Sequence, residues 1–127
     1  MAFASGSPTE GNTTQSGGKY NTHVDKTATY TAPQKKNKKS VTVAATVTKD
    51  DVTYDVTSIG PKAFKGSKAK KIKIKSKKLK SISKSAFKGS KVNKSKIKVY
   101  VPKSKYKAYV KMLTKAGIKK KNIKKLK

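Results

Sequence analysis

Five lysines in two short apolar runs are the residues whose type and spacing could bind a ligand. Lys71, Lys73 and Lys75 alternate with isoleucines in KKIKIKS, and Lys96 and Lys98 alternate with apolar residues in SKIKVYVP. Because side chains along a β-strand point alternately to its two faces, all five are predicted on an outward face. Clustered ammonium groups attract anions, so the pattern indicates an anion-binding surface. A solvated face that only keeps the protein soluble is the alternative, and it stays open.

The charge of the chain is concentrated in its second part. The 127 residues include 34 basic residues, all of them lysine, and five acidic residues, for a formal net charge of +29. All five acids lie within residues 1–55, so residues 56–127 carry 27 lysines and no carboxylate side chain. Such a chain attracts any polyanion at low salt through counterion release. Base-specific recognition leans on the planar fork of arginine, which is absent, so we expect no specific recognition of nucleic acid.

The residue types of catalytic and metal centres are scarce. His23 is the single histidine, cysteine is absent, and Asp50, Asp51 and Asp55 stand in or near an expected turn. A general acid–base pair needs a cleft and a partner, and a zinc site needs several nitrogen or sulfur ligands. The sequence therefore predicts a protein that is not an enzyme and has neither cofactor nor metal. No stretch approaches the ~18 apolar residues of a membrane span.

One sequence motif occurs twice in the chain. SIGPKAFKGSK and SISKSAFKGSK begin 23 positions apart, which aligns Phe64 with Phe87. Each copy leads into a lysine-flanked apolar run. The second copy carries two extra residues before this run, which makes Ile97 the equivalent of Ile72 and leaves Tyr100 at the edge of the lysine face. A period in the low twenties with one short strand per unit is typical of a β-solenoid. We therefore expect Phe64 and Phe87 to occupy equivalent interior positions in successive coils.

The segments before the repeats differ sharply in composition. Residues 1–27 are rich in glycine, serine and threonine and are predicted to be a flexible leader or linker. Their first five residues, MAFAS, resemble either the end of a signal peptide or an expression scar. Residues 28–58 are predicted to form N-terminal strands. Within them, two alternating runs joined by a short polar turn predict a β-hairpin near residues 41–58.

The repeats and the end of the chain complete the predicted fold. About two repeats occupy residues 59–102, and residues 103–127 form a C-terminal cap with a helix from about residue 105 to residue 116. The apolar face of this helix could either cover the open end of the coil or lie on an anionic membrane. The fold class is therefore a β-rich α+β protein, a short leucine-rich-repeat-like β-solenoid with an N-terminal hairpin cap and a C-terminal helix cap.

The repeated segments resemble a known family. VTSIGPKAFKGSKAKKIKIKS and LKSISKSAFKGS are similar to the repeats of the BspA-type leucine-rich repeat family, and the ending VYVPKSKYKAYVKMLTKAGIKKKNIKKL resembles its lysine-rich C-terminal cap. The resemblance covers residues 28–127, which we expect to form a single domain. The chain departs from the family pattern at Ser67 and Ser90, where the family often has cysteine, and at Ala69, where leucine is usual.

The resemblance implies a function without catalysis. Members of the family are mostly secreted or cell-surface proteins, and some are linked to adhesion. It implies a secreted or bacterial cell-surface binding or adhesion module. With the lysine face, this predicts an anionic polymer as partner, such as a wall polymer or acidic glycan, or another ligand on a host or cell surface. Two alternatives stay open, a structural capping fragment of a larger surface protein and a non-specific polyanion binder. We expect a monomer without a transmembrane segment.

Overall fold

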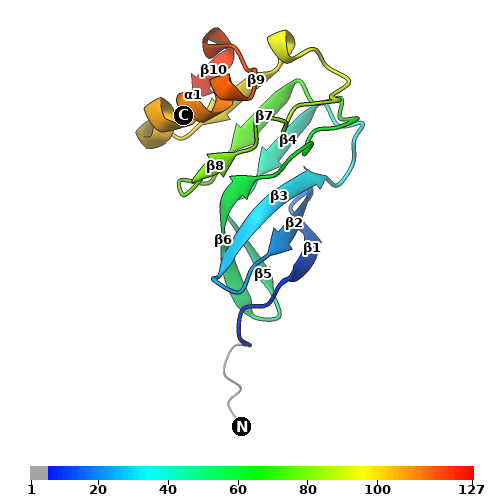
Figure 1. Cartoon of the computed structure of the whole chain (residues 1–127), viewed down its shortest axis with the longest axis vertical. Helices are drawn as coiled ribbons and strands as arrows, with labels where there is room; N and C mark the ends of the chain where they lie inside the picture. The colour runs from blue at the N-terminus through cyan, green and yellow to red at the C-terminus, as the bar shows by residue number, and fades with distance from the viewer. Residues whose placement is uncertain (1–5) are drawn as a thin grey trace.

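The computed structural model describes residues 6–127, and the MAFAS segment interpreted above lies outside these residues. These residues form two β-sheets and one α-helix, and in Figure 1 most of the first sheet lies below the second sheet and the helix. The first sheet has the order β1-β2-β3-β6-β5, with β8 also paired to β6, and the second has the order β10-β9-β7-β4. The first-sheet strands are β1 (Gly11–Gln15), β2 (Gly18–Thr22), β3 (Thr27–Pro33), β5 (Thr46–Lys49), β6 (Val52–Ile59) and β8 (Ser81–Ile82). The second-sheet strands are β4 (Ser40–Val43), β7 (Lys71–Ile74), β9 (Lys98–Val101) and β10 (Ile123–Lys125), and the helix is α1 (Tyr106–Lys115).

The segment predicted to be a flexible leader forms an antiparallel hairpin instead. Strands β1 and β2 pair from Gln15 opposite Gly18, and Ser16 and Gly17 between them both have positive φ. Two central residues with positive φ make the type I′ turn that suits the twist of a hairpin. Tyr20 and Thr22 of β2 are buried. The prediction was wrong because the strands are polar by composition, and their burial depends on this one tyrosine and on contacts with distant strands.

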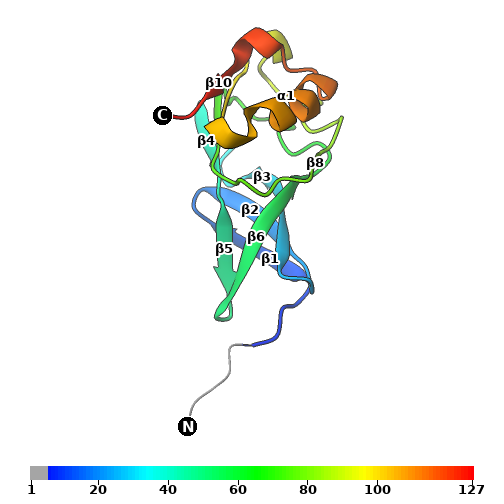
Figure 2. The same ribbon diagram turned by 90° about the vertical axis from the view of Figure 1, so that its left-hand side faces the viewer.

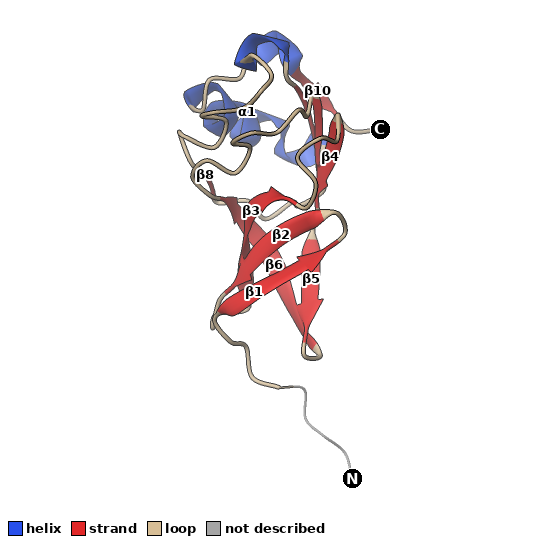
Figure 3. Ribbon diagram, turned by 90° about the vertical axis from the view of Figure 1, so that its right-hand side faces the viewer, coloured by secondary structure: helices blue, strands red, loops and turns tan. Residues whose placement is uncertain are grey.

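The first sheet is nearly closed by a side chain. Strands β1 and β5 lie at the two ends of the strand order, and Gln15 of β1 bridges them. Its side-chain amide donates to the carbonyl of Thr48 at 2.9 Å, and its Oε1 accepts from the backbone amide of Thr48 at 2.9 Å. The Gln15 amide therefore takes the place of a backbone partner, and β1 and β5 meet across the front of the sheet in Figure 3.

The predicted hairpin near residues 41–58 is only partly right. β5 and β6 pair antiparallel around Asp50 and Asp51, both with positive φ. The first predicted strand, however, breaks at Ala44 and Ala45. Its beginning, β4, pairs in parallel with β7 in the second sheet, and only β5 belongs to the hairpin. The alternation predicted from sequence continues through the break, which is why the sequence alone did not separate the two strands.

The coil is built from strand pairs that alternate between the sheets. The chain passes from the first sheet to the second three times, as β3 to β4, β6 to β7, and β8 to β9. The pairings β3–β6, β6–β8, β4–β7, β7–β9 and β9–β10 are all parallel, as expected for stacked coils. Figure 2 shows α1 beside the upper coil and β6 running from the lower sheet toward it. The fold is β-rich and leucine-rich-repeat-like, with one small helix.

The register between the coils differs from the sequence alignment. Ile72 and Ile74 of β7 are buried as predicted, but Ile72 lies opposite Val99, not opposite Ile97. Residues 94–96 form a 3₁₀ turn before β9, which delays the strand by two positions. Because the slip is an even number of residues, the same side-chain faces stay inward.

The repeated motif forms the turn of each coil. Phe64 and Phe87 stack with ring centroids 5.0 Å apart and an interplanar angle of 5°, which confirms their equivalent interior positions. The backbone of one turn bonds to the next, since the Phe64 amide donates to Ala86 at 2.9 Å and the Gly66 amide to the next copy at 2.7 Å. Tyr30 of β3 stacks on Phe64 with centroids 5.5 Å apart, so the aromatic column extends into the first sheet.

Helix α1 covers the end of the coil. Tyr109 and Leu113 are buried, and Tyr106 and Val110 are partly buried, so this side of the helix packs on the core. Gly117 has φ +97° just after the helix, and its amide donates to Thr114. The amide of Ile118 donates to Leu113 at 3.0 Å. This pair of bonds is the Schellman motif, which ends a helix with a left-handed glycine.

Candidate anion-binding face

Lysines gather on the outward face of the second sheet. Lys71 of β7 lies opposite Lys98 of β9, and Lys73 lies opposite Tyr100. On the other side of β9, Lys124 of β10 also lies opposite Tyr100. Since paired residues on one face of a sheet stand about 5 Å apart, these side chains form two adjacent rows. We call these residues, together with Lys75, the basic face.

Two grooves lie at the basic face. One, with a volume of about 450 Å³, is lined by Lys71, Lys73, Lys75, Tyr100, Lys125, Leu126 and Lys127. The second, of about 430 Å³, shares Lys75, Leu126 and Lys127 with the first and adds Lys77, Pro102, Lys103 and Ser104. Lysine supplies most of the lining, and Tyr100 and Leu126 supply the uncharged surface of the first groove.

The ammonium groups of this face have little to neutralise them. Residues 56–127 contain no carboxylate side chain, and Asp55, the nearest acid in sequence, pairs with Lys78 at 3.2 Å. The Nζ of Lys71 lies 5.0 Å from the centroid of the Tyr100 ring, a distance at which the negative face of the ring attracts a cation. Like charges in such rows repel one another, so an anion placed between them would relieve the repulsion.

The structure brings together most of the lysines that the sequence singled out. Lys71, Lys73 and Lys75 line the first groove, and Lys98 stands beside Lys71. Lys96 lies in the 3₁₀ turn before β9 and is not part of the rows. Whether these residues bind an anion stays a prediction.

Sequence reasoning misplaced Tyr100 on this face and missed the C-terminal lysines Lys125 and Lys127. Tyr100 was placed at the edge of the face because Ile97 was aligned with Ile72, whereas the ring lies opposite Lys73 in the interior of the sheet. Lys125 ends the short strand β10 and Lys127 follows it. The repeats contain no pattern that predicts β10, because this strand lies beyond the last copy of the motif.

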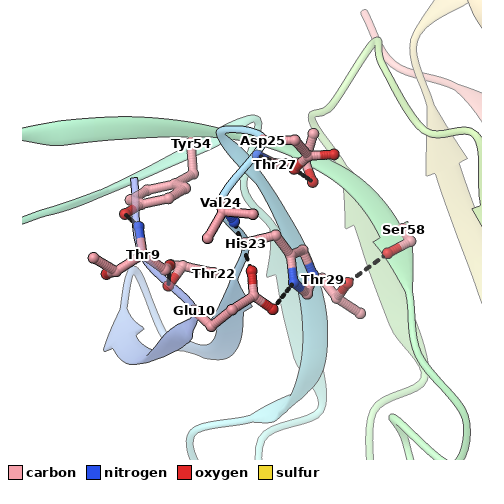
Figure 4. A network of polar contacts seen from close by, with 10 residues as sticks. All are labelled: Thr9, Glu10, Thr22, His23, Val24, Asp25, Thr27, Thr29, Tyr54 and Ser58. Carbon is pink, nitrogen blue, oxygen red and sulfur yellow. Dashed lines mark hydrogen bonds and ion pairs between the residues drawn. The ribbon is translucent and has the colours of Figure 1, made fainter. Parts of the chain in front are cut away.

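His23 connects the segment before β1 to strand β3, which the prediction of a flexible leader did not include. Its Nδ1 lies 3.3 Å from Glu10, and its Nε2 lies 2.8 Å from the hydroxyl of Thr29 (Figure 4). The Thr29 hydroxyl also bonds to that of Ser58 on β6 at 2.7 Å. The second Glu10 oxygen accepts from the amide of Val24 at 2.6 Å. These bonds fasten the segment before β1 to the β2–β3 loop and to β6.

Residues 6–127 hold neither a cluster of metal ligands nor a helix suited to span a membrane. No group of three or more histidine, cysteine, aspartate or glutamate residues there could hold a metal ion. Within the same residues, no helix has both the length and the apolar character needed to cross a membrane.

Comparison with known proteins points to one family. Residues 38–126 match the model of the BspA-type leucine-rich repeat region (6 copies). A search of curated protein sequences finds no match. Among solved structures, a leucine-rich cell surface protein from Faecalibacterium prausnitzii A2-165 is 26% identical with a TM-score of 0.60, over 81% of this chain. A leucine-rich repeat protein from Bacteroides capillosus ATCC 29799 shares the fold, with a TM-score of 0.55 and 22% identity over 75% of this chain and 73% of its own. The chain spans only 26% of the Faecalibacterium protein.

Proposed function

Because the chain belongs to the BspA-type leucine-rich repeat family, we propose that it is a non-enzymatic binding module of a secreted or cell-surface protein. The ligand is an anionic polymer, held on the basic face. The similarity to a leucine-rich cell surface protein over most of the chain supports the surface location.

One observation carries the choice of ligand. Two connected grooves on the basic face are lined mainly by lysine, in a part of the chain without a single carboxylate side chain. A surface that only had to be soluble would gain from mixed charges, which attract each other in place of repelling. A polymer with regularly spaced negative groups can engage several of these lysines at once, whereas a single small anion engages one or two.

Binding at defined salt tests the proposal. Glycerol phosphate teichoic acid, polygalacturonate and duplex DNA are immobilised, and the chain is titrated onto each at several salt concentrations up to about 0.2 M. We expect a wall polymer or acidic polysaccharide to be retained at about 0.15 M salt, where charge-only attraction to DNA has largely been screened. Retention of none of the three at that salt, or equal loss of all three, contradicts the proposal.

A matched pair of variants locates the surface. The double variant Lys73→Gln/Lys75→Gln removes two charges from the basic face. The control Lys84→Gln/Lys88→Gln removes two exposed charges from the turn that contains Phe87, outside both grooves. We expect the first variant to reduce the slope of log affinity against log salt by about two and the control to leave it almost unchanged. An equal reduction in both variants would show that net charge, not this face, binds the polymer.

A further inference from the structure

Tyr100 is an aromatic ring set among lysines. It lies in register between Lys73 of β7 and Lys124 of β10, and Lys98 precedes it by two positions on the same face of β9. Its ring is half-buried and lines the first groove. Position 100 is where a strict continuation of the lysine row would place another charge. The ring instead interrupts the row with an uncharged surface.

The first groove therefore has two kinds of surface. Tyr100 and Leu126 are its uncharged residues, and the remaining residues that line it are lysines. The Lys71 ammonium, 5.0 Å from the ring centroid, is held at the groove by its attraction to the ring. A ligand that fits both surfaces must carry negative groups and, between them, a surface that packs against an aromatic ring.

The chemistry of the ring selects among anionic polymers. The face of an aromatic ring is negative and attracts polarised C–H groups as well as cations. A pyranose ring presents such C–H groups on its faces, while the carboxylate of a uronic acid projects from its edge. A sugar of this kind can pack on Tyr100 while its carboxylate meets a neighbouring lysine. A chain of inorganic phosphate offers charge but nothing to cover the ring.

We propose that the first groove binds an acidic polysaccharide, with Tyr100 packed against a sugar ring and the lysines around it paired with the carboxylates. This inference rests on the proposed function, which requires only an anionic polymer, and it names the class of that polymer. The lysines supply attraction that salt weakens, and Tyr100 supplies a contact that salt leaves almost unchanged.

The experiment compares two probes that differ in the presence of the sugar. Polygalacturonate carries one carboxylate per pyranose ring, and inorganic polyphosphate of matched total charge carries no ring. Affinity is measured for both at about 0.15 M salt, for the unmodified chain and for Tyr100→Leu and Tyr100→Phe. We expect the unmodified chain to prefer polygalacturonate. We expect Tyr100→Leu to weaken its binding about tenfold with an unchanged salt slope, and Tyr100→Phe to retain it.

A second tyrosine provides the control. Tyr106 also lies under a lysine, with the Lys125 Nζ 5.0 Å from its ring centroid, but it lines a different groove beside Val110. Tyr106→Leu should leave the preference for polygalacturonate intact.

The outcomes separate the two claims. If polyphosphate binds as tightly as polygalacturonate, or if Tyr100→Leu leaves polygalacturonate binding unchanged, the inference fails and the proposed function stands. If neither polymer is retained, and teichoic acid is not retained either, the proposed function fails and the inference fails with it.

Discussion

Phe64 and Phe87, 23 positions apart in the chain, stack with nearly parallel rings whose centroids are 5.0 Å apart. That separation is close to the spacing of adjacent hydrogen-bonded strands, so each ring fills the interior of one coil and covers the ring of the next. Tyr30 continues the column on the far side of Phe64. The aromatic column thus joins the coils to the nearly closed first sheet.

Truncation of one ring should show how much the column contributes to stability. Phe87 is buried, and Phe87→Ala removes its contacts with Phe64 and leaves a cavity. We expect the free energy of unfolding to fall by about 3–5 kcal/mol, measured by urea denaturation. Val24→Ala, at a side chain that is 65% exposed, should change it by no more than about 0.5 kcal/mol. A loss at Phe87 as small as that at Val24 would be inconsistent with a packed column.

The bridge between Gln15 and Thr48 predicts a smaller, local effect. Gln15→Ala removes both hydrogen bonds to Thr48 and a third, from the Gln15 amide to the hydroxyl of Thr13, all at a partly exposed position, so we expect a loss of about 1 kcal/mol. Hydrogen exchange of the Thr48 amide should become faster. Gln15→Glu keeps the acceptor for that amide but loses the donor to the Thr48 carbonyl, and should give an intermediate loss. Unchanged exchange at Thr48 in both variants would argue that the bridge is not maintained in solution.

The hydroxyl of Tyr109 is expected to contribute to stability separately from the buried ring. The buried hydroxyl accepts from the amide of Leu79 at 2.9 Å and donates to the carbonyl of Ser76 at 2.9 Å. Tyr109→Phe keeps the ring and leaves both backbone groups without this partner, so we expect a loss of about 2 kcal/mol. Thermal unfolding with unchanged far-ultraviolet circular dichroism would distinguish this local loss from misfolding.

Tyr30→Phe should raise the free energy of unfolding, whereas Tyr109→Phe should lower it. The Tyr30 hydroxyl is buried and forms no hydrogen bond with any residue in the described range 6–127. The same chemical change therefore removes a polar group without breaking a bond, and we expect a gain of about 1 kcal/mol. A loss in this variant comparable to that of Tyr109→Phe would indicate a partner for the Tyr30 hydroxyl.

Alkaline pH should enlarge the difference between Tyr30→Phe and the unmodified chain. Burial raises the pKa of Tyr30, and the neighbouring Tyr20 raises it further. Above about pH 10 the unfolded chain releases the tyrosine proton while the folded chain keeps it, so the unmodified protein loses stability as pH rises. Lysine deprotonation is common to both proteins and cancels in the comparison. The advantage of Tyr30→Phe, measured by urea denaturation, should therefore grow between about pH 9 and pH 11; a constant difference would contradict the shift.

The sequence predicted the elements whose signals are local. The spacing of Phe64 and Phe87 predicted their equivalent interior positions, and the pattern of residues 105–116 predicted a helix with an apolar face. Gly117 suits the position after the helix because glycine adopts the positive φ found there without strain. Each of these signals, a repeated motif, an apolar helical face and a glycine, can be recognised in a short stretch of the sequence.

The errors arose where distant contacts decide the structure. β1 is polar, and its place depends on Tyr54, whose hydroxyl accepts from the Thr9 amide at 2.9 Å, and on Thr48. The register of β9 depends on a turn that the first repeat lacks, and a slip of two positions leaves the apolar pattern unchanged. That slip is also why the sequence did not place Tyr100 at the centre of the basic face.

The hydrogen bonds between Gln15 and Thr48 also affect the tendency of the chain to aggregate at high concentration. An exposed edge strand has unpaired amide and carbonyl groups that can pair with a strand of another chain and start aggregation. With the Thr48 groups already occupied, β5 offers fewer such groups at its rim. A single glutamine thereby helps a strand-rich molecule stay separate from its neighbours when many are crowded together.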